Sequence, residues 1–239
     1  METLTSEQFI SELVLKKDER ELASVQRSYR DEAPGNKFLG IRMKNIFELA
    51  KKYMDMPAAE IAKLLASQYY EARVGAVSIM DFKARAKNTP AEVKKSLFDL
   101  YISKHHRINN WDMVDRAAPY VVGGYLFDKN REPLYRLAAS KNVWERRTAI
   151  VATYYFIRMD DLQDTFRIAE LLVNDDHDLI QKAVGSWIRE AGKKDKLLLT
   201  GFLDEHASGM PRTMLRYAIE KMNDKEKQHY LSVNKNQSK

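Results

Sequence analysis

Apolar side chains recur every three or four positions along almost the whole chain, as at Phe9 and Leu13 or at Leu162 and Phe166. That spacing puts the apolar residues on one face of a helix. Alternation of apolar and polar positions between turns is typical of strands, and it is missing. The pattern therefore predicts an all-α protein, with about a dozen helices of roughly ten to fifteen residues joined by short turns.

Local signals support this interpretation. Thr89 stands before Pro90, and Glu92 follows three residues after the threonine. A capping Thr, a Pro in the first helical turn and a Glu at the third position are the usual start of a helix. We therefore expect a helix that begins at Pro90 with Thr89 as its N-cap. Gly123-Gly124, which follows two valines, is expected to form a turn.

The helices are expected to come in pairs that repeat along the chain. Similar short runs surround four cations, which are Arg73, Arg147, Lys182 and Arg216. The intervals between them are 74, 35 and 34 residues, and 74 is twice 37. Such a period is typical of helical solenoids. Because the TPR and ankyrin consensus patterns are absent, we interpret the chain as a HEAT-like repeat solenoid, an α-α superhelix.

This periodicity leads to a prediction about function. In a solenoid the second helix of every pair lines the concave face. A cation near the start of successive second helices would form a row of positive charge along one groove. Such a concave basic groove suits a phosphate backbone better than a compact ligand. The alternative is that each cation lies on a solvated helix face.

Composition changes this picture only slightly. The 239-residue chain carries 40 Lys and Arg against 34 Asp and Glu, for a formal net charge of +6 and an isoelectric point near 9.2. This excess is modest for a nucleic-acid-binding protein. No stretch is rich in Gly, Ser or Pro. We therefore expect one domain over residues 1–239, folded to about residue 232, with a disordered tail at 233–239.

Several classes of chemistry are excluded. The chain has no Cys, which excludes disulfides, thiolate zinc sites and cysteine nucleophiles. His105 and His106 are adjacent and point apart on a helix, and HExxH, P-loop and GxGxxG motifs are absent. We therefore expect no metal and no cofactor. No signal peptide or bilayer-spanning run is found, so a cytoplasmic protein, associated with the nucleoid through DNA, is expected.

The densest polar stretch of the chain is residues 105–115. Within it, Trp111 and Asp115 are four residues apart and share one face of a helix. A large aromatic beside a carboxylate, next to a basic groove, is a candidate site. The alternative is a core Trp with Asp112 or Asp115 acting as a helix cap. Trp144 and Arg147 repeat the arrangement three residues apart, although a Trp early in a helix often simply packs.

Four separated runs carry a resemblance to a known family. They are residues 105–115, 142–147, 180–185 with 189–190, and 210–220, and residues 38–41 match a further landmark nearer the N-terminus. On these motifs the chain resembles the bacterial AlkD-like DNA alkylation repair enzymes, from about Tyr29 to about Tyr230.

The resemblance implies a monomeric DNA glycosylase of base excision repair, which hydrolyses N-glycosyl bonds in double-stranded DNA. Its substrates would be cationic alkylated purines such as 3-methyladenine and 7-methylguanine, released without drawing the base into a deep pocket. It implies that Asp115 is the catalytic carboxylate, that Trp111 cradles the lesion and that Arg147 lies in the groove. The other residues expected at the DNA are Tyr29, Arg73, Trp144, Arg146, Lys182, Ser186, Trp187, Arg212 and Arg216.

One departure from the family matters for activity. The family has Trp directly after the Gly that corresponds to Gly185, whereas this chain has Ser186 there and Trp187 one residue later. One step along a helix turns a side chain by about 100°. Two further functions therefore stay open: a non-catalytic DNA-binding scaffold with an impaired site, and a protein-binding solenoid.

Overall fold

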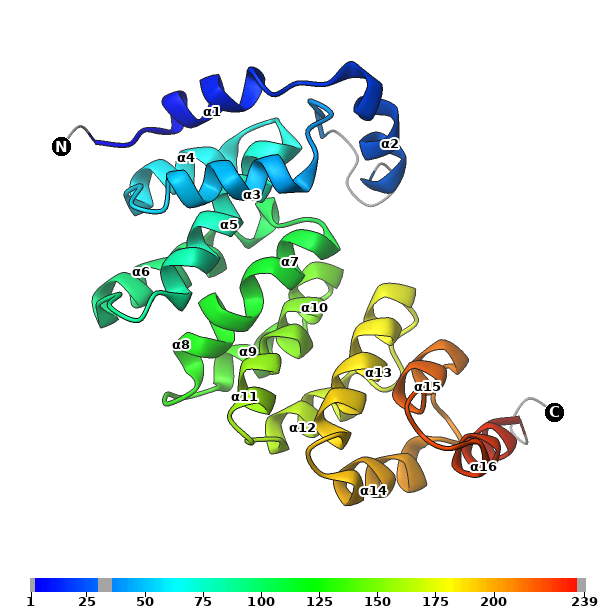
Figure 1. Ribbon diagram of the computed structural model, residues 1–239. Coiled ribbons are helices and arrows are strands. Elements are labelled where there is room, and N and C mark those ends of the chain that lie inside the picture. Colours follow the sequence, from blue (N-terminus) through cyan, green and yellow to red (C-terminus); the bar gives the residue numbers. More distant parts are fainter. Residues whose placement is uncertain (1–2, 30–35, 236–239) are drawn as a thin grey trace. The chain divides into compact units, whose positions relative to one another are not determined.

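The computed structural model describes residues 3–29 and 36–235. Every regular element in these residues is helical, apart from one isolated bridge between Lys37 and Tyr69 (Figure 1). The all-α prediction is confirmed. The described residues contain sixteen α-helical segments, more and often shorter than expected. Among these helices, none has the length and apolar character that a bilayer crossing requires.

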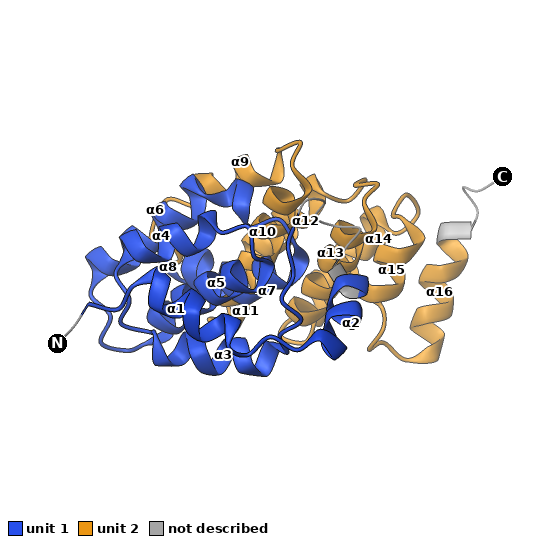
Figure 2. Ribbon diagram, turned by 90° about the horizontal axis from the view of Figure 1, so that it is seen from above, with its two compact units in different colours: residues 1–125 blue, residues 126–239 orange. Residues whose placement is uncertain are grey.

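The chain divides into two compact units, Met1–Tyr125 and Leu126–Lys239 (Figure 2). The expected single domain therefore stays a prediction. The helical elements of the first unit are α1 (Ser6–Val14), α2 (Glu19–Tyr29), α3 (Met43–Lys52), α4 (Ala58–Ala66), α5 (Tyr70–Arg85), α6 (Ala91–Ser103), η1 (His105–Arg107), α7 (Trp111–Ala117) and η2 (Ala118–Gly123). A short helix, α8 (Gly124–Leu126), follows across the boundary.

The second unit is built in the same way. Its helices are α9 (Glu132–Ala138), α10 (Val143–Ala152), α11 (Tyr154–Arg158), α12 (Gln163–Leu171), α13 (Asp178–Gly192), α14 (Lys196–His206), α15 (Arg212–Ala218) and α16 (Asp224–Lys235). Helix α16 continues to Lys235, three residues beyond the expected end of the folded chain. Residues 236–239 of the expected tail lie outside the described residues.

Two local predictions were wrong. The N-cap of α6 is Pro90, because the Thr89 hydroxyl instead donates a hydrogen bond to the Lys83 carbonyl at 2.6 Å. Gly123-Gly124 is not a turn: Gly123 ends the π-helical segment η2, and Gly124 continues as α8. The apolar residues of η2 are buried, because this segment packs on α5, α6 and α7. A turn would instead have placed these residues at the surface, in contact with solvent.

Helix α5 is the centre of the first unit, and its residues from Tyr70 to Asp81 are buried on all sides. It packs against α1, α3, α4, α6 and α7. Its buried polar side chains find partners within the protein, as burial demands. The Ser78 hydroxyl donates to the Val74 carbonyl at 2.7 Å, and Asp81 pairs with Arg85 at 2.7 Å and with Arg116 at 3.2 Å.

Glu71 on α5 explains the motif at residues 38–41. One of its carboxylate oxygens accepts hydrogen bonds from the backbone N–H groups of Leu39, Gly40 and Ile41, at 2.9, 2.9 and 3.4 Å. Gly40 has φ +74°, and a Cβ there would lie 2.4 Å from the Asp18 carbonyl oxygen. The motif is thus a backbone turn wrapped around a buried carboxylate, and only glycine suits its central position.

Five helices are each the second of two consecutive helices and begin at comparable places in the repeat. They are α5, α7, α10, α13 and α15, and their N-caps are Tyr69, Asn110, Asn142, His177 and Pro211. These N-caps recur at intervals of 41, 32, 35 and 34 residues. In the first unit α5 packs on α7, and in the second unit α10 packs on α13 and α13 on α15. The predicted repeat of helix pairs is confirmed.

Three of these second helices begin with the same two hydrogen bonds in the preceding loop. Two residues before the N-cap, a side-chain oxygen accepts from the N–H of the N-cap residue over 2.9 to 3.2 Å; the acceptors are Ser67, Ser140 and Asp175. Four residues after the N-cap, a side chain donates to the carbonyl of that same loop residue over 2.9 to 3.1 Å; the donors are Arg73, Arg146 and Gln181. We call these two contacts the loop hydrogen-bond pair.

Glycine also decides how closely α13 and α15 approach. A Cβ built on Gly185 would lie 2.4 Å from the Met214 carbonyl oxygen and 2.6 Å from the Tyr217 Cβ. Arg189 on α13 also pairs with its neighbour Glu190 and with Glu220, which lies two residues after the end of α15. The motifs at 180–190 and 210–220 therefore meet in one helix–helix contact.

We predict that Gly185→Ala lowers the free energy of unfolding by roughly 1–3 kcal/mol, because the added methyl group must push α15 away. Gly201→Ala on α14 is the matched control, since a Cβ there meets nothing within 4 Å. That control should instead gain about 0.5–1 kcal/mol from helix propensity. Urea unfolding of both variants measures the difference, and equal stability would contradict the close approach.

Candidate functional site

The fifth residue after the N-cap defines a common position on the five second helices. The residues there are Val74, Asp115, Arg147, Lys182 and Arg216. Three of the four cations singled out in the sequence share this position, and in α7 a carboxylate replaces the cation. Arg73 stands one position earlier, so its assignment to the same row was wrong.

Arg73 does not face solvent. Its side chain is 1% exposed and donates to the carbonyls of Ser67 at 2.9 Å and Gln68 at 3.4 Å, and to the amide oxygen of Asn36. Burial, together with the neighbouring Arg107, lowers the pKa of Arg73 to about 10. The guanidinium ties the loop before α5 to its own helix, and the contact of Arg73 with DNA stays a prediction.

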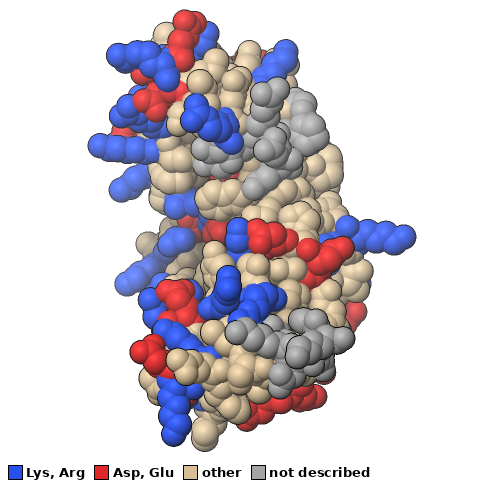
Figure 3. Space-filling view, turned by 90° about the vertical axis from the view of Figure 1, so that its right-hand side faces the viewer, with Lys and Arg blue, Asp and Glu red and all other residues tan. Residues whose placement is uncertain are grey.

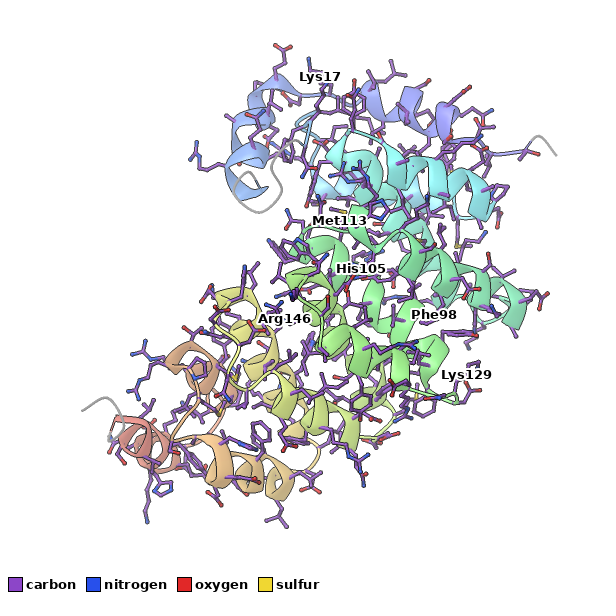
Figure 4. All side chains as sticks on the ribbon, turned by 180° about the vertical axis from the view of Figure 1, so that it is seen from behind. Lys17, Phe98, His105, Met113, Lys129 and Arg146 are labelled. Atoms are coloured by element: carbon purple, nitrogen blue, oxygen red, sulfur yellow. The ribbon has the colours of Figure 1, made fainter. Side chains whose placement is uncertain are left out.

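Arg146 has the equivalent role in the second unit and can be located in Figure 4. Its guanidinium donates to the carbonyls of Ser140 and Lys141 at 3.1 and 3.0 Å and pairs with Asp175 at 2.6 Å. These contacts use the donors that a phosphate would need. Arg146 therefore joins the loop before α10 to the loop before α13, and its place at the DNA stays a prediction.

The cations at the common position of the second unit differ in accessibility. We refer to Arg147, Lys182 and Arg216 as the cation row. Arg147 is 7% exposed and donates to the Leu179 carbonyl at 2.6 Å. Lys182 is half-buried and pairs with Asp178 at 2.5 Å, whereas Arg216 is exposed. Because α10, α13 and α15 pack in succession, these three side chains come from neighbouring helices of one unit.

The surface charge is mixed. On the face shown in Figure 3, Lys and Arg side chains are interspersed with Asp and Glu side chains. A continuous basic groove therefore stays a prediction.

Helix α7 carries Trp111 and Asp115, both half-buried. The N-cap is Asn110, whose side chain accepts a hydrogen bond from the Trp111 N–H at 2.7 Å. The alternative that an aspartate caps this helix is therefore wrong. With the cap supplied by Asn110, Asp115 lies in the second turn, on the same face as Trp111.

A second carboxyl group lies one turn before Asp115. The Tyr70 hydroxyl on α5 donates a hydrogen bond to Asp112, whose other carboxylate oxygen is buried and has no hydrogen-bond partner. Burial, with a smaller contribution from the charge of Asp115, raises the pKa of Asp112 to about 6. Asp112 belongs to the polar stretch at residues 105–115, but no feature of the sequence indicated that the Tyr70 hydroxyl would hydrogen-bond to it.

The other two tryptophans pack inside the second unit. Trp144 is 9% exposed. Trp187 stacks on Tyr154, with ring centroids 5.1 Å apart, and packs against the core cluster that includes Ile157 and Leu162. Their place at the DNA stays a prediction. Trp187 lies one residue after Ser186 on α13 and packs against the core cluster, so its ring points in a different direction from the Ser186 side chain.

The remaining predicted site residues lie in different surroundings, and their contact with DNA stays a prediction. Ser186 is half-buried. Arg212 donates to the Leu231 carbonyl at 3.0 Å, which joins α15 to α16. The side chain of Tyr29 lies outside what the structure describes. Among the described residues, no group of three or more His, Asp or Glu side chains could hold a metal ion.

The buried carboxyl of Asp112 predicts a pH dependence of stability. Its folded-state pKa of about 6 lies above the ordinary value of 3.8. The folded state thus holds the proton more tightly, and this stability is complete below about pH 4 and is lost as the pH rises to about 6. Asp112→Asn keeps an acceptor for Tyr70 but cannot ionise. It should be more stable than the wild type at pH 7, by on the order of 3 kcal/mol.

Urea unfolding from pH 4 to pH 7 measures this effect. Asp99→Asn, which removes an exposed carboxylate paired with Lys95 in the same unit, is the matched control. An Asp112→Asn curve that runs parallel to the wild type across this range would contradict an ionising buried carboxyl.

Comparison with known proteins supplies the family. The chain is similar in structure to a predicted DNA alkylation repair enzyme from Enterococcus faecalis, with a TM-score of 0.67, 14% sequence identity, and coverage of 87% of this chain and 98% of the other. AlkD2 from Streptococcus mutans aligns with a TM-score of 0.46 and 17% identity over 96% of this chain and 97% of its own. Curated protein sequences give no significant match. The family model for DNA alkylation repair enzymes matches residues 9–222. The chain belongs to the DNA alkylation repair enzyme family.

Proposed function

We propose that this protein is a DNA glycosylase that releases cationic alkylated purines, such as 3-methyladenine and 7-methylguanine, from duplex DNA. The observation that carries the proposal is the carboxylate of Asp115. It occupies the helix position that holds a cation in α10, α13 and α15. A protein that only bound phosphates would gain nothing from a negative charge at this position.

The reaction explains the need for a carboxylate. Alkylation at N3 or N7 makes the base cationic and a good leaving group, and bond breaking moves positive charge onto the deoxyribose. A carboxylate at about 4 Å, at an effective dielectric constant of about 20, stabilises a unit charge by roughly 4 kcal/mol. That energy is worth on the order of a thousandfold in rate. Asp115 can also orient the attacking water.

Trp111 supports the same chemistry. It shares the face of α7 with Asp115 and is half-buried, so part of its surface is accessible. An indole beside the cationic sugar or base adds about 0.5–2 kcal/mol of cation–π attraction. We assign the contact with the phosphate backbone to Lys182 and Arg216. Arg147 contributes less, since one of its donors is engaged by Leu179.

A second candidate function is a DNA-binding scaffold without catalytic activity. It is favoured by Ser186, which stands where the resemblance expects a tryptophan, and by the packing of Trp187 on Tyr154. The scaffold would keep Lys182 and Arg216 but lack one aromatic face of the cradle. Base release distinguishes the two functions, because the scaffold binds DNA and releases nothing.

Asp115→Asn should lower the rate of base release about a thousandfold, because it removes the charge that stabilises the sugar cation. Its affinity for the same DNA should stay unchanged or rise slightly. The measurement is release from duplexes that each carry one defined lesion. Asp99→Asn, an exposed carboxylate on α6, should keep the wild-type rate.

The choice of lesion tests the mechanism further. Excision should follow positive charge on the base, so neutral uracil and hypoxanthine should remain in the duplex. A wild-type rate from Asp115→Asn, or efficient uracil release, would contradict the claim that Asp115 acts by stabilising positive charge on the sugar. A wild type that releases no lesion while binding DNA would favour the scaffold.

Duplex affinity should fall steeply with salt, by about 0.9 log units per tenfold salt for each phosphate neutralised. Lys182→Ala and Arg216→Ala should each reduce the slope of that plot by about one phosphate. Lys194→Ala at the end of α13, where the lysine pairs with Asp160, is a control of equal charge. If all three variants gave the same slope of affinity against salt, the DNA would have to bind elsewhere on the surface.

A further inference from the structure

The second unit contains a cavity of about 240 Å³ that the proposed reaction does not use. It lies where the end of α13 meets the start of α14, the end of α15 and the start of α16. Four cations line it, namely Arg189, Lys193, Lys196 and Lys221. Its volume corresponds to roughly eight water molecules, which is enough for a phosphate with a small organic group.

Arg189 has the least exposed side chain of these four cations. Its side chain is 16% exposed, and its Nε lies buried without a hydrogen-bond partner. The two terminal nitrogens contact Glu220 and Glu190, the latter at 3.4 Å. A mostly buried guanidinium held by two carboxylates has a fixed position, and an anion that replaces Glu220 can accept from the terminal nitrogen that Glu220 now occupies.

The present partners of the cations are glutamates that an anion could replace. Glu220 contacts both Arg189 and Lys221, the latter at 2.8 Å, and its side chain is 48% exposed. It can therefore swing into solvent without leaving a buried charge. The four cations face three glutamates in all, Glu190, Glu220 and Glu226, so the cluster keeps an excess of positive charge.

This cavity is separate from the cation row. Arg189 follows Lys182 on α13 by about 10 Å of helix length, and the three lysines of the cavity come from other turns and elements. The cavity also has an apolar part, contributed by Leu199, Ala218 and Met222. A phosphodiester backbone would leave that part unfilled, whereas a small phosphate monoester would use both.

We propose that this cavity binds phosphate monoesters, with the phosphate displacing Glu220 from Arg189 and Lys221. A monoester carries about −1.5 to −2 charges near pH 7, and a diester carries about one. The doubly charged group therefore competes better against a glutamate that already holds two cations. The organic part of the ligand would lie against Leu199 and Met222.

Calorimetric titration with glycerol 3-phosphate at fixed ionic strength tests the site. Lys193→Ala and Lys221→Ala should each weaken binding roughly tenfold, the usual effect of losing one charged hydrogen bond. Lys194→Ala is the matched control, because Lys194 directly follows Lys193 in the chain, pairs with Asp160 and does not line the cavity. It should keep the wild-type affinity.

Glu220→Gln provides a gain-of-function test. Neutralising the competing carboxylate should tighten binding severalfold, whereas Glu205→Gln, which makes the same charge change at an exposed site on α14, should not. No binding by the wild type, equal weakening by Lys193→Ala and Lys194→Ala, or no gain from Glu220→Gln relative to Glu205→Gln would each overturn the proposal.

Three ligands, each titrated into the wild type and the same variants, distinguish the possible sources of the phosphate group. They are inorganic phosphate, glycerol 3-phosphate, and a short duplex with a 5′-phosphate set against the same duplex with a 5′-hydroxyl. Preference for the small monoester indicates a free metabolite. A Lys221-dependent preference for the phosphorylated duplex indicates a DNA end. Both results support a monoester site, and neither requires glycosylase activity.

Discussion

The main constraint on this protein is that the loop before each second helix must hold one backbone conformation. Its residues Ser67, Ser140 and Asp175 are half-buried, so their backbone groups are only partly accessible to water. Each hydrogen bond formed by these groups contributes about 0.5–1.5 kcal/mol of net stability. The loop hydrogen-bond pair meets this need at α5, α10 and α13 with a side chain on each side of the N-cap. Each of these loops is thereby tied to the first turns of the helix that it enters.

This constraint divides the basic residues into two kinds. A cation four residues after the N-cap, such as Arg73 or Arg146, turns back to the loop and serves the fold. A cation one residue later points elsewhere, and Arg216 is exposed. Under the proposed function, fewer cations are therefore accessible to a phosphate backbone than the sequence suggested. At α7 the same position holds Asp115, so one register sets both the cations and the carboxylate.

The family motifs divide in the same way. Residues 38–41 wrap around Glu71, and Arg189 with Glu220 and Gly185 fixes the approach of α13 to α15. These motifs maintain the fold and would persist in a relative without activity. The run around Trp111 and Asp115 instead places a half-buried aromatic and a half-buried carboxylate on one face of α7. A family match therefore supports the architecture more strongly than the reaction.

The sequence by itself determined the helical class, the repeat period and Asp115 as the candidate carboxylate, because apolar spacing and recurring runs are local properties of the chain. Tertiary structure decided which side chains are available. The N-caps are as different as Tyr69, Asn142 and Pro211, so the sequence could not show that Arg73 lies one position before the register of Arg147. One residue turns a side chain by about 100°. That rotation separates Arg73, which contacts its own loop, from Arg147, which donates to the Leu179 carbonyl on α13, and it likewise turns Trp187 toward the core cluster.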